Sequence, residues 1–304
     1  MNRRSALRIL AGGAGCFLPR AFAARSDQQE EFTLRSETRL VLVDVSVQDG
    51  QRNYVTGLSK ENFVLSEDGR PQTITIFDNE DLPVTVGILV DESRSMGPKR
   101  DDVLQAATEL ISESNPLDEV FVLNFNDIVT AGLPPDKLFS SDIMELQSAL
   151  YRGFPQGRTA LYDAVAAGLR QLKLGRQNRK TLVLISDGGD NASEHTRHDA
   201  VDLVENSFAT IYTVGLYDAD DPDSKPGILT HLAHISGGEA YFPENPPETI
   251  PICRRIAKEI RSRYTLGYRP EAGSGKERVR HLRIQVNAPG REHLRVRARE
   301  SYRL

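Results

Sequence analysis

The sequence predicts an α/β protein with a doubly wound, mostly parallel central sheet and helices on both faces. Two observations predict this class. Apolar runs alternate with amphipathic segments through the middle of the chain, and stretches of alternating β pattern flank that region. Neither flank, 36–80 or 262–304, has enough strands to be stable alone. We therefore expect the flanks to pair as a small β-sandwich into which the central domain, 82–261, is inserted.

Each element of the central domain is expected from its hydrophobic pattern. Short β-branched runs are typical of strands buried on both faces of a parallel sheet, and we place them at 84–90, 119–125, 180–186, 209–215 and 239–242. Apolar residues at helical spacing predict the connecting helices at 100–114, 142–150, 160–172, 199–206, 227–236 and 247–263.

Residues 1–23 have the pattern of an export signal. A start with three arginines precedes an apolar stretch, 9–18, and Ala21-Phe22-Ala23 gives a small-x-small cleavage site. The apolar stretch is too short to span a bilayer, which takes about 20 apolar residues. We therefore expect an exported protein, periplasmic or extracellular, with no membrane span.

A few residues indicate the export route and the net charge and cysteine content of the mature chain. The pair Arg3-Arg4 fits a twin-arginine signal, although two ordinary basic residues explain it equally well. Gly13 stands where a lipobox carries a large aliphatic residue, so lipid anchoring at Cys16 is not expected. Cleavage changes the formal net charge from −5 to −9, which argues against nucleic acid as a partner. It also leaves Cys253 as the single cysteine, expected to be a small buried hydrophobe.

Oxygen-bearing side chains follow the predicted strands. Asp91, Ser93 and Ser95 come directly after strand 84–90, Asp187 ends strand 180–186, and Thr159 precedes helix 160–172. Ligands bind at the carboxyl ends of strands in open α/β sheets. Carboxylates and hydroxyls without imidazole or thiolate suit a hard cation, so the pattern favours Mg²⁺ or Mn²⁺.

These motifs resemble the metal-ion-dependent adhesion site of the von Willebrand factor type A domain, and the resemblance covers about 82–261. It implies a Rossmann-like fold in which Ser93, Ser95 and Thr159 offer hydroxyls to the metal, while Asp91 and Asp187 act directly or through water. It also implies binding rather than catalysis: the metal captures an Asp or Glu carboxylate of a partner protein. The flanks are similar to those of an exported bacterial subgroup frequent in Acidobacteria.

Four further residues are candidates for partner contact. Glu92 and Arg94 stand between the ligand positions and are expected to point away from the metal. Asp190 either caps the following segment, lies behind the metal ligands or faces the partner. Asp220 belongs to the acidic loop 217–227, which would contact a basic partner, hold a second cation or simply be solvated.

An enzyme of another class is the alternative. "ILVDES" and "ISDGGDN" also resemble the acidic motifs of haloacid-dehalogenase-type phosphatases, which would use Asp91 and Asp187 with Mg²⁺. That family places an acid two residues after its nucleophile, whereas Ser93 stands here and cannot act as a general acid at neutral pH. No Gly-x-Ser-x-Gly motif is present, and His195 and His198 are expected at the surface. A non-enzymatic function is therefore favoured.

The C-terminal region is strongly basic, with fifteen Lys or Arg against five Asp or Glu over 254–304. Arg295, Arg297 and Arg299 alternate with apolar residues, which places their side chains on one face of a strand. We expect a solvated outer face rather than a surface for an acidic partner, because exposed sheet faces and edges commonly carry charge.

Overall fold

The computed structural model describes residues 40–217, 225–270 and 279–303. All of them belong to one compact unit, Thr38–Leu304. The predicted export signal and Asp220 lie outside the described residues. Within the described ranges, no helix combines the length and the apolar character needed to cross a membrane.

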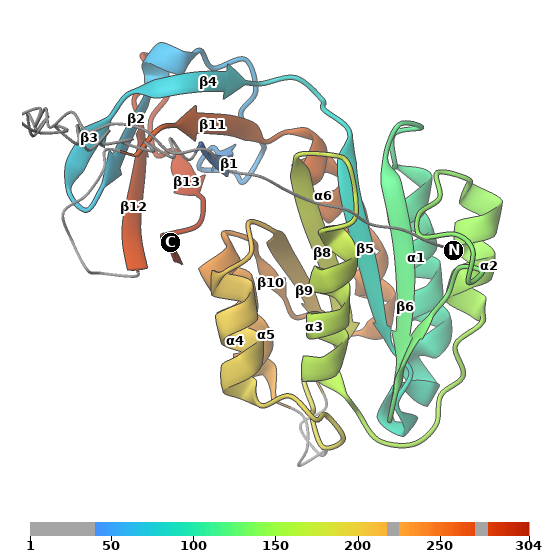
Figure 1. Ribbon diagram of the computed structural model, residues 1–304. Helices are drawn as coiled ribbons and strands as arrows, with labels where there is room; N and C mark the ends of the chain where they lie inside the picture. Colours follow the sequence, from blue (N-terminus) through green and yellow to red (C-terminus); the bar gives the residue numbers. More distant parts are fainter. Residues whose placement is uncertain (1–39, 218–224, 271–278, 304) are drawn as a thin grey trace, which may run out of the picture. The chain divides into compact units, whose positions relative to one another are not determined.

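A six-stranded sheet forms the central part, in the order β10-β9-β8-β5-β6-β7 (Figure 1). Strands β5, β6, β8, β9 and β10 run parallel, and β7 pairs antiparallel with β6. All five predicted strands are present. The edge strand β7 was not predicted, because three residues are too few to show an alternating pattern. The strands are β5 (Val84–Asp91), β6 (Glu119–Phe125), β7 (Val129–Ala131), β8 (Arg179–Ser186), β9 (Thr210–Gly215) and β10 (Ala240–Tyr241).

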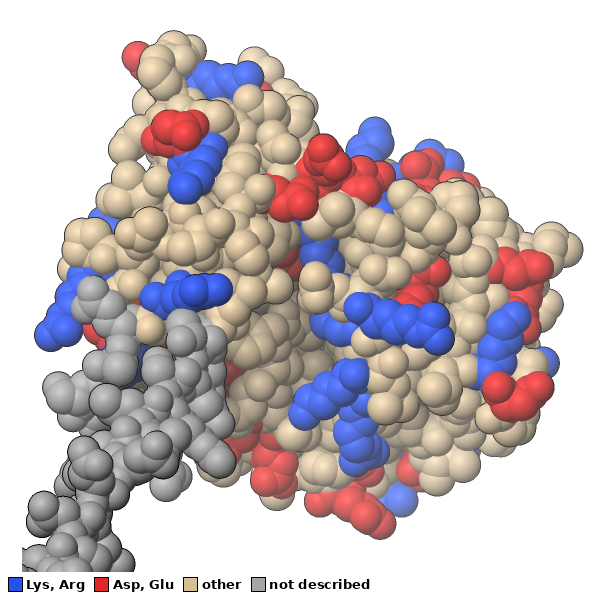
Figure 2. Space-filling view, turned by 45° about the horizontal axis from the view of Figure 1, so that its top comes forward, with Lys and Arg blue, Asp and Glu red and all other residues tan. Residues whose placement is uncertain are grey.

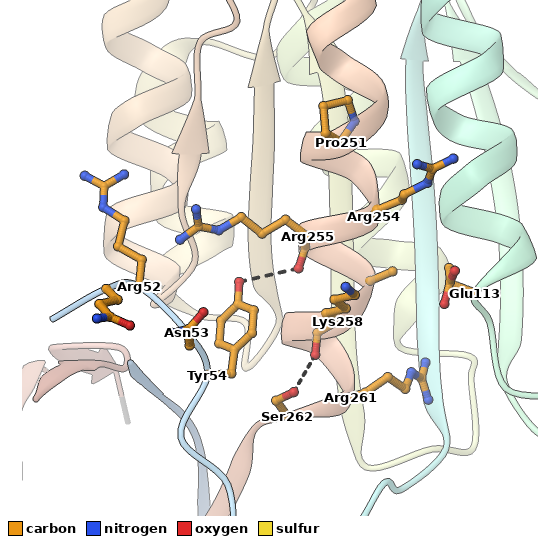
Figure 3. Close-up of a pocket in the computed structure, with 12 residues that line it drawn as sticks. Arg52, Asn53, Tyr54, Glu113, Pro251, Arg254, Arg255, Lys258, Arg261 and Ser262 are labelled. Atoms are coloured by element: carbon orange, nitrogen blue, oxygen red, sulfur yellow. Dashed lines mark hydrogen bonds between the residues drawn. The ribbon is translucent and has the colours of Figure 1, made fainter. Parts of the chain in front are cut away.

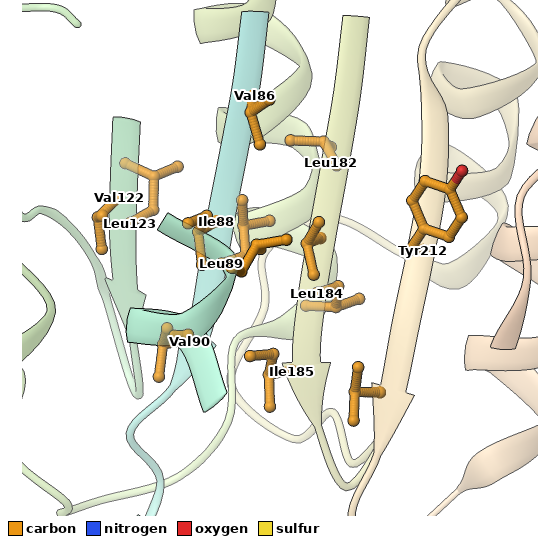
Figure 4. Packing of buried hydrophobic residues seen from close by; sticks show 14 of the residues in the cluster. Val86, Ile88, Leu89, Val90, Val122, Leu123, Leu182, Leu184, Ile185 and Tyr212 are labelled. Atoms are coloured by element: carbon orange, nitrogen blue, oxygen red, sulfur yellow. The ribbon is translucent and has the colours of Figure 1, made fainter. Parts of the chain in front are cut away.

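Burial on both faces explains why the central strands are almost continuously apolar. Every residue of β5 is buried, and Figure 4 shows Ile88 and Leu89 of β5 packed among Val122, Leu182 and other side chains of the neighbouring strands. Complete burial of one such aliphatic side chain is worth about 1.5–3 kcal/mol. This packing fixes the strands whose ends carry the polar side chains.

Six helices cover the sheet. Helix α1 packs beside α2 and α6 on one face, and α4 packs between α3 and α5 on the other (Figure 1). Each corresponds to a predicted helix, but α6 begins two residues later than expected because Pro246–Glu248 form a 3₁₀ turn. The helices are α1 (Arg100–Ser112), α2 (Ile143–Tyr151), α3 (Leu161–Leu172), α4 (Arg197–Glu205), α5 (Pro226–Ser236) and α6 (Thr249–Arg261).

The two flanks pair with each other, as predicted. One sheet has the order β13-β1-β11-β4 and the other β14-β12-β2-β3, so each contains strands from both ends of the chain. Their inward-facing side chains share one hydrophobic core. The strands are β1 (Val41–Gln48), β2 (Phe63–Glu67), β3 (Arg70–Gln72), β4 (Ile74–Asp78), β11 (Tyr264–Tyr268), β12 (Val279–Val286), β13 (Arg295–Arg297) and β14 (Ser301–Arg303).

The predicted solvated face of the basic C-terminal strands is wrong for two of its three arginines. Arg295 is exposed. Arg297 instead binds Glu239 at 2.5 Å and also binds Glu259 of α6. Arg299 is only 5% exposed, and its guanidinium lies 5.1 Å from the ring centre of Phe208. These partners are distant in sequence, so the local alternation of charge could not indicate them.

Two smaller expectations concern cysteine and surface charge. Cys253 is buried in α6 as expected, and burial raises the pKa of its thiol to about 12.

On the face shown in Figure 2, basic and acidic side chains are interspersed. That face therefore does not present the uniformly basic surface typical of nucleic-acid binding.

Candidate functional site

Two neighbouring strands bring the predicted carboxylates together. Asp91 is the last residue of β5, and Asp187 directly follows β8. These strands pair in parallel with Val90 opposite Ile185, so their carboxyl ends lie side by side. The two acids, separated widely in sequence, therefore meet at one edge of the sheet.

Hydroxyl groups connect the two acids. The backbone N–H of Ser93 donates to Asp91 Oδ1 at 2.8 Å. The hydroxyls of Ser93 and Ser95 are 3.1 Å apart, and Ser95 Oγ donates to Asp187 Oδ2 at 2.6 Å. Ser93 also begins the 3₁₀ helix Arg94–Lys99 that leads into α1. The Asp-x-Ser-x-Ser spacing thus places both serine hydroxyls between the carboxylates.

Thr159 reaches the same place from the loop before α3. Its backbone N–H donates to Asn191 Oδ1 at 2.9 Å, and its carbonyl accepts from the N–H groups of Asn191 and Ala192 at 3.0 Å each. This loop is therefore attached to the segment that follows Asp187. The attachment holds Thr159 at the wall of the site without using its hydroxyl.

The site is a hollow of about 300 Å³ that opens to the surface. Four of the five predicted metal residues line it, namely Ser93, Ser95, Thr159 and Asp187. Arg94 and Arg158 also line the hollow, and both are exposed at its rim. Asp91 is only 1% exposed and lies behind the serines. The structure therefore brings all five predicted residues together, with Asp91 as the innermost.

The environment of Asp91 is unusual for a carboxylate. Burial, together with the negative charge of Asp187, raises its pKa to about 7, while hydrogen bonds from Ser186 and Ser93 act in the opposite direction. A divalent cation between the two acids would remove this penalty, because its charge favours the ionised form of both.

Two residues that support the site, Ser186 and Gly188, were not predicted from the sequence. Ser186 Oγ donates to Asp91 Oδ2 at 2.6 Å and accepts from the backbone N–H of Gly188 at 3.0 Å. Gly188 has a φ of +84°, and a Cβ there would lie 2.5 Å from the carbonyl oxygen of Lys225. Only glycine suits this position. The "ISDGG" motif contained both residues, but the serine could not be distinguished from the last residue of a strand.

Glu92 requires a correction. Its side chain points away from the metal position, as expected, but into the protein, where it is only 1% exposed. Arg100 Nε donates to Glu92 Oε2 at 3.0 Å, and Arg100 also binds the carbonyl of Gly153 at 2.7 Å. Burial raises the pKa of Glu92 against the effect of Arg100. Glu92 therefore fixes the 152–156 loop and is not accessible to a partner.

The other predicted partner contacts, and the two histidines near Asp187, differ in how exposed they are. Arg94 is exposed, as a partner contact would be. Asp190 is half-buried and accepts from the backbone N–H of Tyr162 at 3.2 Å and from Ser193 at 2.5 Å, so it caps α3. His195 lies 2.6 Å from Asp163 through Nδ1, and exposed His198 is 3.5 Å from Asp202.

The donor set fits a hard divalent cation. Ser93, Ser95, Thr159 and Asp187 line one hollow, and the carboxylate of Asp91 lies directly behind the serines. Carboxylate and hydroxyl oxygens are the ligands that Mg²⁺ and Mn²⁺ prefer. Among the described residues, no group of three or more His, Cys, Asp or Glu side chains is arranged to hold a metal ion. The site depends on hydroxyls as much as on carboxylates.

Part of the chain matches a known family. Residues 86–189 match the family model of the von Willebrand factor type A domain, and this segment contains all five predicted metal residues. No significant match was found among curated protein sequences. The structure is similar to a von Willebrand factor type A protein from Catenulispora acidiphila, with a TM-score of 0.53 and 13% identity over 88% of this chain and 75% of that chain.

Two other solved structures share the fold. Proximal thread matrix protein 1 from the mussel byssus has a TM-score of 0.53 and 14% identity over 64% of this chain and 51% of that chain. The PilB minor pilin from Streptococcus sanguinis has a TM-score of 0.50 and 13% identity over 61% of this chain and 63% of that chain. Residues 86–189 therefore match the von Willebrand factor type A domain, and the solved structures share the fold whose sheet carries the site at its carboxyl edge.

Proposed function

We propose that this protein is an exported, metal-dependent protein-binding module of the von Willebrand factor type A class. Asp91, Ser93, Ser95, Thr159 and Asp187 hold Mg²⁺ or Mn²⁺, and the bound ion captures an Asp or Glu carboxylate of a partner protein. The observation that carries the proposal is an open hollow lined by Ser93, Ser95, Thr159 and Asp187, with the carboxylate of Asp91 directly behind the serines.

The balance of charge supports binding rather than storage of the ion. Two carboxylates neutralise a divalent cation, and three neutral hydroxyls complete much of its oxygen shell without adding charge. The ion would supply an electrophilic centre for one further oxygen from outside. Arg94 stands exposed at the rim of the hollow and is placed to contact an acidic partner.

The export signal at 1–23 and the domain limits of 82–261 belong to the same proposal. The basic start, the short apolar stretch and the small-x-small motif support export. The likeness of the flanks to an exported bacterial subgroup supports export as well.

Calorimetric titration of the chelator-stripped protein with Mg²⁺ and Mn²⁺ tests the metal site. We expect saturable binding in the natural protein and none in Asp91→Asn or Asp187→Asn. Asp136→Asn is the matched control, because Asp136 is exposed and away from the hollow. Unchanged metal affinity in both site variants would refute the assignment of these residues.

The same preparations distinguish binding from catalysis. Hydrolysis of a generic phosphate ester is measured with Mg²⁺ present and with EDTA. The proposal expects no turnover in either condition. Metal-dependent turnover that is lost in Asp91→Asn would instead support the phosphatase alternative.

A further inference from the structure

A second hollow lies between α6 and the turn that follows β1, away from the proposed metal site (Figure 3). Its volume is about 720 Å³, compared with about 300 Å³ at the carboxylate site. Small-molecule sites generally have about 300–1,000 Å³. Its ionisable lining is basic, with one acid, Glu113, against the cations Arg52, Arg254, Arg255, Lys258 and Arg261. We name it the α6 basic pocket.

Ion pairs neutralise only part of this charge. Arg254 binds Glu109 at 3.0 Å, and Arg261 binds both Asp118 at 2.5 Å and Asp81 at 3.0 Å. Among the described residues, Arg52, Arg255 and Lys258 have no acid within ion-pair distance, although Glu239 acts on Arg255 from further away. The positive charge that the pocket keeps therefore comes from these three residues.

Arg255 gives an independent indication of a missing acceptor. Its Nε and Nη2 groups are shielded from solvent and have no hydrogen-bond acceptor in the described part of the chain. The guanidinium lies 5.9 Å from the ring centre of Tyr241, which orients it but accepts no conventional hydrogen bond. Leaving buried N–H groups without acceptors is unfavourable. A rotation of the Arg255 side chain that turns these groups into the hollow would let an oxyanion accept from them.

Arg52 is held at the rim by a braced turn. Its φ of +65° is uncommon for a residue with a side chain. Asp49 stabilises the turn, because its Oδ1 accepts from the N–H groups of Gln51 at 2.9 Å and Asn53 at 2.8 Å. The turn therefore fixes the backbone at Arg52, from which its exposed side chain extends at the rim of the pocket.

The position of Lys258 and Arg261 in the last turn of α6 has a simpler explanation, since cations stabilise the carboxyl end of a helix. That explanation does not extend to Arg52, which is on another element, or to the N–H groups of Arg255. Stabilisation of the helix end therefore does not explain why cations from two elements gather around the pocket.

We infer that the α6 basic pocket binds a small multivalent oxyanion, a molecule that carries two or more phosphate or carboxylate groups. Arg255 and Arg52 supply planar guanidinium groups that can bind such groups with paired hydrogen bonds, and Lys258 supplies a further cation. The site is separate from the proposed metal site and does not depend on it.

Calorimetric titration of the protein with inorganic tripolyphosphate, and separately with propane-1,2,3-tricarboxylate, tests this inference. The protein is first stripped of metal ions and the chelator is then removed, because EDTA is itself a multivalent carboxylate and would compete with the probes. Constant ionic strength keeps the screening of charge equal in all titrations. We expect saturable 1:1 binding of at least one probe, and the stronger probe identifies the anionic group that the pocket prefers. In the double variant Arg52→Gln/Lys258→Gln, affinity should fall at least about tenfold.

The matched control is Lys173→Gln/Arg176→Gln, which removes the same charge from exposed residues outside the pocket. Its affinity should stay within about twofold of the natural protein. The same two titrations are repeated on Arg255→Gln, and circular dichroism verifies that this variant folds. Absence of saturable binding for both probes, or an equal loss in the control variant, would overturn the inference.

Discussion

Two buried carboxylates of this molecule, Asp91 and Glu259, have opposite electrostatic environments. Asp91 is 1% exposed at the carboxyl end of the central sheet, and Glu259 is 0% exposed in α6, beside the flanking strands. Burial and the charge of Asp187 raise the pKa of Asp91 to about 7. Burial also opposes ionisation of Glu259, but the charges of Arg263 and Arg297 outweigh it and lower its pKa.

The difference separates a structural acid from one suited to a ligand. Glu259 accepts from Arg263 at 3.2 Å, from Tyr54 at 3.0 Å and from Arg297, so its charge is compensated within the chain. Asp91 is bound by a hydroxyl and a backbone N–H, which carry no net charge. A cation bound from solution would compensate the negative charge of Asp91, as Arg263 and Arg297 compensate that of Glu259.

The largest effect is expected from Glu259→Ala. This change leaves the buried guanidinium of Arg263 and the largely buried Arg297 without their shared counter-charge. Breaking a buried ion pair by removal of one partner costs about 3–5 kcal/mol. Urea unfolding should show a loss of stability of that size, whereas Glu80→Ala, at an exposed position, should change it by less than about 0.5 kcal/mol. A loss below about 1 kcal/mol would show that the arginines find other partners and that the compensation described here is not specific.

The pH dependence of stability should have opposite signs at the two acids. The pKa of Asp91 is raised from 3.8 to about 7, so the metal-free folded state holds its proton more tightly than the unfolded state does. Its contribution is present at low pH and is lost as the pH rises from about 4 through about 7, with an upper limit of about 4 kcal/mol. Glu259 has a lowered pKa, so its contribution is lost as the pH falls through the folded value.

Comparison of the natural protein with Asp91→Asn in EDTA isolates the contribution of Asp91 to the pH dependence of stability. The contribution of Glu259 is common to both proteins and cancels. The stability of the natural protein relative to the variant should decrease between about pH 4 and pH 8. A difference that stays constant with pH would mean that Asp91 does not titrate in this range.

The sequence contained most of the information about the fold and the carboxylate site. Apolar strands and amphipathic helices are local patterns that can be recognised in the sequence. The rule that ligands bind at the carboxyl ends of strands then predicted that Asp91 and Asp187 lie at one edge of the sheet. The position of Glu92 between the predicted ligands indicated that it would point away from the metal, and the structure places it outside the hollow. That position could not indicate that Arg100 and the 152–156 loop would cover Glu92, because that contact depends on tertiary packing.

The environment of Glu259 was not predictable in the same way. Its partners Arg297 and Tyr54 come from the two flanks, about 40 and 200 positions distant. The charged residues at 295–299 were expected to be solvated because no local pattern records a counter-charge elsewhere. The pairing of β1 with β13, in which Ser46 lies opposite Arg297, brings the two flanks together there.

The smallest expected effect compares the hydroxyl partners of the two acids. Ser186→Ala removes the donor to Asp91 and the acceptor of the Gly188 N–H, and Tyr54→Phe removes the donor to Glu259. Loss of a group that orients a metal ligand typically lowers metal affinity about 10- to 100-fold, which corresponds to about 1.4–2.7 kcal/mol. Mg²⁺ titration should show this loss in Ser186→Ala. Tyr54→Phe should keep the metal affinity and lose only about 1 kcal/mol of stability in urea, since Arg263 and Arg297 still compensate Glu259. Equal metal affinities in the two variants would mean that the hydroxyl of Ser186 does not orient Asp91 for an ion, and the distinction between the two acids would then depend on burial alone.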